Sequence, residues 1–169
     1  MFSPLDNLKR KISENGGFFN AHAHLDRAFT VTPHDMILTK HPLTEKWELV
    51  DEVKKNSSEE DYYQRICYAL KNQKDKGVTS VISFIDIDSV AEYRAIRGAV
   101  RAKQYGKDIG VNLYLASQTL KGVVSNHSRR LLETCLTEGW LDVIGSLPKA
   151  DFNTDRHLDT VCSMARAAK

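Results

Sequence analysis

Apolar residues recur along the chain with two alternating spacings. Spacing of three or four residues predicts helices over 4–14, 44–55, 58–75, 89–105, 128–138 and 155–168. Short apolar runs between them predict strands at FFNAH, VTSVISFIDI, IGVNLYLASQ and LDVIGSLP. The inward residues expected in the 58–75 helix are Tyr62, Ile66, Ala69 and Leu70, and those in the last helix are Leu158, Val161, Cys162 and Ala165. Ser57 and Glu60 predict a capping box at the start of the 58–75 helix.

This order of elements predicts an α/β protein in which four βα units follow an N-terminal helix, within a single domain over 1–169. Two parallel-sheet architectures fit the order. A doubly wound sheet would carry a Gly-rich phosphate loop after its first strand, and the sequence has neither G-x-G-x-x-G nor G-x-x-x-x-G-K-[ST]. A (βα)8 barrel instead gathers its site residues at the carboxyl ends of the strands.

Polar residues do gather at the predicted strand ends, which favours the barrel. They are His22, His24 and Asp26, then Asp86 and Asp88, then Gln118 and Thr119, then Lys149 and Asp151. A complete barrel takes about 250 residues and eight units, so the sequence predicts about half a barrel. The irregular stretch 25–43 carries two further histidines, His34 and His41, that are candidates for the entrance to a site.

Composition narrows the classes of partner. The net charge of +2, from 24 basic and 22 acidic residues, gives no drive toward nucleic acid. No apolar run reaches the length of a membrane span, and the first residues do not resemble a signal peptide. The three separated cysteines predict buried thiols and a reducing cytoplasm rather than disulfides. Exposed sheet edges near Phe18 and Val143 predict self-association.

His22 and His24 are the main candidates for chemistry. Residues two apart on a strand point to the same side, so both imidazoles can project from the end of the first strand. Imidazole is a common ligand of zinc and iron, although a catalytic site needs three or four ligands. On spacing alone, a pair of partly exposed structural histidines fits equally well, and the position at a strand end favours metal binding.

The segment NAHAHLDRAFT resembles the first-strand motif of the amidohydrolase superfamily, and it is most similar to the cytosine deaminase-like branch. GVTSVISFIDIDS, VNLYLASQ and DVIGSLPKAD resemble the second, third and fourth strands of that branch, so the resemblance spans residues 17–169. It implies a metal-dependent hydrolase of C–N bonds on a (βα)8 barrel. It further implies deamination of a heterocyclic, cytosine-like small molecule by water that a divalent metal, Zn or Fe, activates.

The resemblance also assigns roles to individual residues. His22 and His24 would be the first two metal ligands, and Asp26 would orient the loop or a ligand. Gln118 would hydrogen-bond the substrate, or a backbone group, and Asp86 would line the mouth of the barrel. Lys149 is a candidate for a carboxylated bridging ligand or an exposed turn residue, and Arg27 for a contact to a substrate anion or an ion pair.

The sequence departs from the family pattern in its extent. The N-terminal β-sandwich usual in this branch is absent, and the remaining ligands and the catalytic glutamate of the family follow the fourth strand. We therefore expect an N-terminal half that is inactive alone. Two alternatives stay open: a non-catalytic half-barrel that pairs with another chain, and a phosphotriesterase-like hydrolase with the same His-x-His start.

Overall fold

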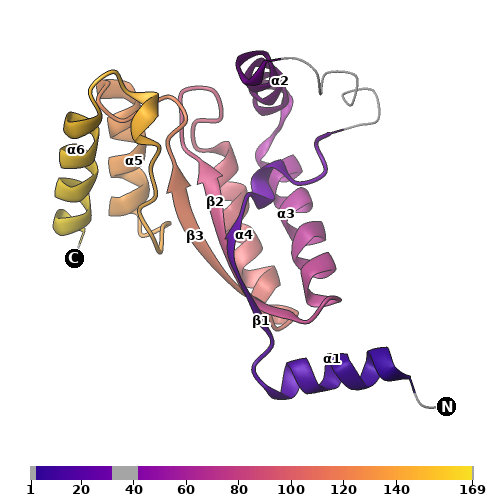
Figure 1. The fold of residues 1–169 in the computed structure, drawn as a ribbon. Helices are drawn as coiled ribbons and strands as arrows, with labels where there is room; N and C mark the ends of the chain where they lie inside the picture. The colour runs from indigo at the N-terminus through magenta and orange to yellow at the C-terminus, as the bar shows by residue number, and fades with distance from the viewer. Residues whose placement is uncertain (1–2, 32–41, 169) are drawn as a thin grey trace.

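The computed structural model describes residues 3–31 and 42–168 (Figure 1). In chain order the elements are α1 (Pro4–Glu14), β1 (Phe18–Ala23), the 3₁₀ turn η1 (Leu25–Arg27), α2 (Leu43–Asn56), α3 (Glu59–Lys74), β2 (Val78–Asp86), α4 (Arg94–Asp108), β3 (Asn112–Gln118), α5 (Asn126–Thr137), the 3₁₀ turn η3 (Pro148–Ala150) and α6 (Thr154–Ala167). The predicted α/β class and the six predicted helices are confirmed. None of the helices in the described ranges is both long and apolar enough to cross a bilayer.

The strands form an open parallel sheet in the order β1-β2-β3. β2 and β3 pair without interruption from Ser80↔Asn112 to Asp86↔Gln118, whereas the register of β1 on β2 shifts twice. The prediction of a strand at LDVIGSLP is wrong. Within the described residues, this segment contributes only the isolated bridge between Ala116 and Val143 to the sheet. The fold is therefore a three-stranded sheet, one strand short of the four predicted, and it does not close into a barrel.

The core lies where α3 and α4 pack on each other and on the sheet (Figure 1). The predicted inward residues of α3 are confirmed, since Tyr62, Ile66, Ala69 and Leu70 are all buried. The two helices approach closely at Gly98, where an added Cβ would lie 2.8 Å from the carbonyl oxygen of Glu59.

Two helix starts differ from their predictions for local reasons. The capping box of α3 is formed by Ser58 and Asp61, one residue later than predicted, because Ser57 instead donates its hydroxyl to the Val53 carbonyl at the end of α2. The helix predicted from residue 89 begins at Arg94, because Asp88 accepts the backbone N–H groups of Val90 and Ala91 and holds the chain in a turn.

The inward face of α6 agrees with its prediction at Val161, which packs against the core, and differs at two other positions. Leu158 and Cys162 are exposed, and the buried residues of this helix are His157 and Met164. The expectation of three buried thiols is therefore wrong for Cys162 and confirmed for Cys67 and Cys135. His157 can be buried because its Nδ1 lies 2.6 Å from Asp151 Oδ2.

The three parallel strands end at the same edge of the sheet, next to η1 and α2, whereas α1 lies at the opposite end of β1 (Figure 1). This arrangement brings the residues that follow each strand into one region.

Candidate functional site

The two candidate metal ligands converge at the end of β1. The Nε2 atoms of His22 and His24 lie 3.2 Å apart, and their rings meet edge to face. The ring of Phe84, from β2, packs on His22 with 4.5 Å between ring centroids. His22 is exposed and His24 is half-buried, so the pair faces outward and packs on the Phe84 ring.

His24 is held in its neutral form. Burial lowers its pKa to about 4, with further lowering by the charges of Arg27 and His22, against a hydrogen bond to the Phe84 backbone that raises it. Neutral imidazole is the form that binds metals, so protons do not compete for this ligand at neutral pH.

The η1 turn is fixed by contacts with later parts of the chain. The backbone N–H of Leu25 donates to Ser83 Oγ at 3.0 Å, and Arg65 from α3 donates to the Asp26 carbonyl at 2.6 Å. The Asp26 carboxylate accepts the backbone N–H of Asp86 at 3.0 Å. Asp26 is fully buried, and this burial, together with the charge of Asp86, raises its pKa to about 7. Asp26 therefore ties the turn to β2.

Arg27 connects the other candidate residues to one another. Its Nη2 lies 2.7 Å from His24 Nδ1 and 2.8 Å from Gln118 Oε1. Its Nε lies 3.7 Å from Asp86 Oδ2. Gln118 and Asp86 thus reach the histidines through the guanidinium, and Arg27 makes the ion pair that was one of its two predicted roles.

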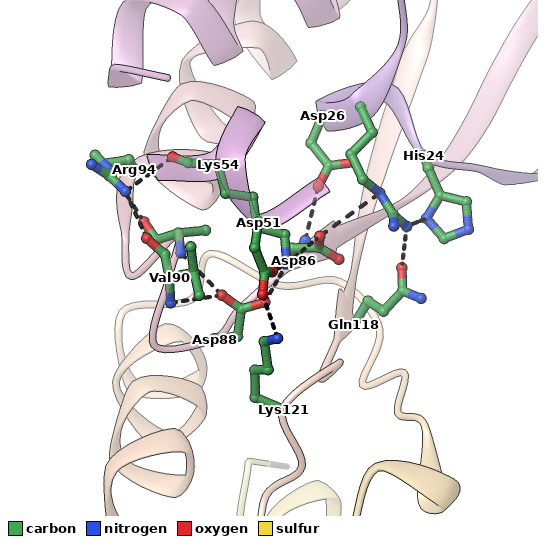
Figure 2. Close-up of polar contacts among 12 residues, drawn as sticks. His24, Asp26, Asp51, Lys54, Asp86, Asp88, Val90, Arg94, Gln118 and Lys121 are labelled. Carbon is green, nitrogen blue, oxygen red and sulfur yellow. Dashed lines mark hydrogen bonds and ion pairs between the residues drawn. The ribbon is translucent and has the colours of Figure 1, made fainter. Parts of the chain in front are cut away.

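Lys54 was missed by the sequence reasoning, although it is central to this region (Figure 2). Its side chain is only 2% exposed, and its Nζ lies 2.9 Å from Asp86 Oδ2 and 2.5 Å from Asp88 Oδ2. Burial would lower the pKa of Lys54, but the two carboxylates outweigh it and raise that pKa. Lys54 also lies 3.7 Å from Asp51, which pairs with Lys121 at 2.6 Å.

The pKa values of the two aspartates beside Lys54 shift in opposite directions. Burial raises the pKa of Asp86 despite the opposing charges of Lys54 and Arg27. Burial would also raise the pKa of Asp88, but Lys54 and the N–H groups of Ala91 and Val90 hold it below its usual value. Local spacing gives no signal for this cluster, because Lys54 and Asp88 are 34 residues apart.

Lys149 follows the segment that was predicted to be the fourth strand. It is exposed in η3, and within the described part of the chain no hydrogen bond or ion pair joins it to His22 or His24. Its neighbour Asp151 accepts the N–H of Val123 at 2.7 Å and contacts His157. His34 and His41 lie outside the described residues.

The spacing of the two histidines suits a zinc ion. A tetrahedral Zn²⁺ with bonds of about 2.0–2.1 Å holds two ligand nitrogens about 3.3–3.4 Å apart, so the Nε2 separation of 3.2 Å fits. Among residues 3–31 and 42–168, no group of three or more His, Cys, Asp or Glu side chains is arranged to hold an ion. A metal-bound His24 would also carry hydrogen on Nδ1, so Arg27 would have to release that atom.

The chain matches members of the amidohydrolase family over part of their length. It is 26% identical over 156 residues to N-isopropylammelide isopropyl amidohydrolase of Pseudomonas sp. strain ADP, covering 89% of this chain and 38% of that protein. It is 42% identical over 145 residues to an uncharacterized protein of Haemophilus influenzae, covering 85% of this chain and 51% of that one. The chain thus spans about half, or less, of the curated relatives that it matches.

A solved structure supports the fold. The crystal structure of 5-methylcytosine deaminase from Klebsiella pneumoniae, liganded with phosphonocytosine, superposes with a TM-score of 0.77 at 21% identity, covering 90% of this chain and 37% of that one. No protein-family model matches the chain.

Proposed function

We propose that this chain is the N-terminal part of a metal-dependent hydrolase that deaminates a heterocyclic, cytosine-like small molecule. The observation that carries the proposal is the convergence of His22 and His24 at the end of β1, with a spacing that suits two ligands of one Zn or Fe ion. The names of the amidohydrolase and the deaminase that the chain resembles support hydrolysis at a C–N bond. Cytoplasmic location and self-association through exposed sheet edges stay predictions.

The described residues have separable tasks in this proposal. A bound metal ion would lower the pKa of its water to near 7 and so supply hydroxide at neutral pH. His22 and His24 would hold the ion, and Arg27 would then release His24 Nδ1. Asp86 holds Arg27, Lys54 in turn holds Asp86, and Gln118 presents its amide beside Arg27.

Metal content tests the proposal directly. The protein, purified at its native length and equilibrated with Zn²⁺, should contain about one ion per chain by elemental mass spectrometry, as a site of this type needs. The double variant His22→Ala/His24→Ala should lose that ion. His127→Ala, which removes an exposed imidazole at the start of α5, should keep it.

Activity then separates the proposed reaction from the alternatives. Ammonia release from cytosine or 5-methylcytosine should require the same two histidines. Metal content that is unchanged in the double variant would refute the assignment. Hydrolysis of phosphotriesters without ammonia release would indicate the phosphotriesterase-like alternative, and a metal-free, inactive protein would indicate the non-catalytic half-barrel.

A further inference from the structure

Arg27 fixes which ring nitrogen of His24 carries the hydrogen atom. A guanidinium has only N–H donors, so His24 Nδ1, 2.7 Å from Arg27 Nη2, must accept with its lone pair. Neutral His24 then carries its hydrogen on Nε2, which lies 3.2 Å from His22 Nε2. The two nitrogens that would hold a metal ion are therefore bonded to each other, and this tautomer of His24 has no free Nε2 lone pair for a metal.

The Nε atom of Arg27 has an unmade hydrogen bond. Nε is buried without a hydrogen-bond partner among the described residues, and so are both carboxylate oxygens of Asp86. Nε lies 3.7 Å from Asp86 Oδ2, which is beyond hydrogen-bond distance. A buried donor and a buried acceptor that stay unbonded are unfavourable. A shift of about 1 Å or less would shorten this distance to that of a charge-assisted hydrogen bond.

Asp86 is fixed in a position to receive this bond. Lys54 Nζ lies 2.9 Å from the same Oδ2 atom and 2.5 Å from Asp88 Oδ2. The backbone N–H of Asp86 donates to Asp26 at 3.0 Å. A carboxylate oxygen has two lone pairs, so Oδ2 can accept from Arg27 as well as from Lys54. Because the Arg27 side chain is 21% exposed and that of Asp86 only 1%, we expect the arginine to move.

We propose that Arg27 is a positioning residue with two positions: bonded to His24 Nδ1 in the metal-free protein, and bonded to Asp86 Oδ2 when His22 and His24 hold a metal ion. The inference rests on the proposed function and deepens it by naming a residue that controls loading of the site. Metal binding at Nε2 leaves the single hydrogen of neutral His24 on Nδ1, facing the N–H donors of Arg27. No proton is gained or lost, because the hydrogen only changes nitrogen. Arg27 exchanges the bond to His24 for the bond to Asp86.

The movement of Arg27 can be tested first without metal. In His24→Ala, Arg27 loses the acceptor that holds it away from Asp86. The Arg27 Nε–H, observed by ¹H–¹⁵N NMR of the native-length protein, should then exchange with water at least about tenfold more slowly than in the wild type, as one new hydrogen bond implies. His22→Ala is the matched control, because His22 contacts His24 and, in the described part of the chain, has no hydrogen bond to Arg27. An unchanged Nε–H in His24→Ala would overturn the inference.

Zinc binding then tests the coupling. Added Zn²⁺ should protect the Arg27 Nε–H of the wild type as His24→Ala does. In competition titrations against a chromophoric chelator, Asp86→Asn should lower the affinity for Zn²⁺ at least about tenfold, because a neutral amide receives Arg27 less strongly than a carboxylate. Asp88→Asn is the matched control: Asp88 contacts the same Lys54 ammonium and makes no ion pair with Arg27 among the described residues, so the affinity should stay within about twofold of the wild type.

A double-mutant cycle separates the role of Arg27 from a structural effect of Asp86. In Arg27→Met nothing competes for His24 Nδ1, so adding Asp86→Asn should not lower the zinc affinity further. An effect of Asp86→Asn that persists in full without Arg27 would refute the coupling. If Arg27→Met does not fold, Arg27→Gln replaces it, because that variant removes the guanidinium and keeps a polar side chain.

The outcomes also separate this inference from the proposed function. Zinc that binds through His22 and His24 while the Arg27 Nε–H stays unprotected would refute the movement of Arg27 and leave the metal site intact. An absence of zinc binding, or zinc binding that is independent of both histidines, would refute the proposed function and the metal coupling together.

Discussion

Replacing Lys54 with methionine should destabilise the protein far more than the replacement of an ordinary helix lysine. Methionine keeps much of the aliphatic length of lysine and removes the ammonium, so the substitution tests the charge. Lys54 is the nearest cation to both Asp86 and Asp88, at 2.9 and 2.5 Å. In the variant, the carboxylates of Asp86 and Asp88, which are 1% and 0% exposed, stay buried without that cation.

The magnitude follows from this burial. Removing one partner of a buried ion pair costs about 3–5 kcal/mol, because the remaining charge stays desolvated. Single domains are stable by about 5–15 kcal/mol, so the variant should lose a large share of its free energy of unfolding. With a urea slope of about 1–3 kcal/mol/M, the unfolding midpoint should fall by about 2 M.

Equilibrium urea unfolding followed by circular dichroism measures this change. Lys55→Met is the matched control on the same helix, since Lys55 is 61% exposed and, among the described residues, pairs with the exposed Glu52 at 3.4 Å. Such surface pairs contribute about 0–1 kcal/mol. A loss below about 1 kcal/mol in Lys54→Met, equal to that in the control, would show that the buried ion pairs do not stabilise the fold.

Three further predictions address packing, thiol reactivity and pH. Gly98→Ala should lower the free energy of unfolding, measured in urea, by about 1–3 kcal/mol, because the added Cβ would overlap the α3 backbone. This loss is expected although alanine has a higher helix propensity than glycine. A stabilised variant would contradict the close approach of the two helices. Under native conditions iodoacetamide should label Cys162 and spare Cys67 and Cys135, because burial raises the pKa of both, to about 12 for Cys135; mass spectrometry of labelled peptides checks this. Burial opposes ionisation of Asp151, but hydrogen bonds from the backbone and from His157 outweigh it and lower the pKa of Asp151. The Asp151 carboxylate therefore stabilises the fold at pH values above its pKa in the unfolded chain. This stabilisation is lost as the pH falls through its lower pKa in the folded protein. The stability lost in Asp151→Asn should therefore be about 1–3 kcal/mol at pH 7 and shrink below about pH 4, and a pH-independent loss in urea unfolding would exclude this linkage.

Helices and strands were predictable where local pattern decides them. The spacing of Tyr62, Ile66 and Leu70 gave the correct face of α3, because the apolar stripe of that helix is its core contact. The partial match to amidohydrolases was likewise carried by a local motif, the His-x-His-Leu-Asp segment. The capping box was misplaced by one residue because adjacent serines, Ser57 and Ser58, both satisfy its pattern.

Features that depend on distant partners could not be predicted. A buried lysine at position 54 contradicts the ordinary preference of lysine for the surface. The ion pairs with Asp86 and Asp88 offset the cost of burying Lys54, and these two residues follow more than 30 residues later. The inward face of α6 was mispredicted for a different, local reason, since His157 is buried through its contact with Asp151 six residues earlier. The central position of Arg27, in η1, depends on Gln118 at the end of β3, 91 residues later.

The contacts that hold η1 have a consequence for the order of folding. Leu25 is bonded across 58 residues to Ser83, Asp26 across 60 residues to Asp86, and Arg27 across 91 residues to Gln118. Closing such long loops is slow compared with forming helices. During synthesis the two histidines emerge early, but the turn beside them can assemble only after Gln118 has left the ribosome. Ligand binding at this turn should therefore develop with the slowest folding phase.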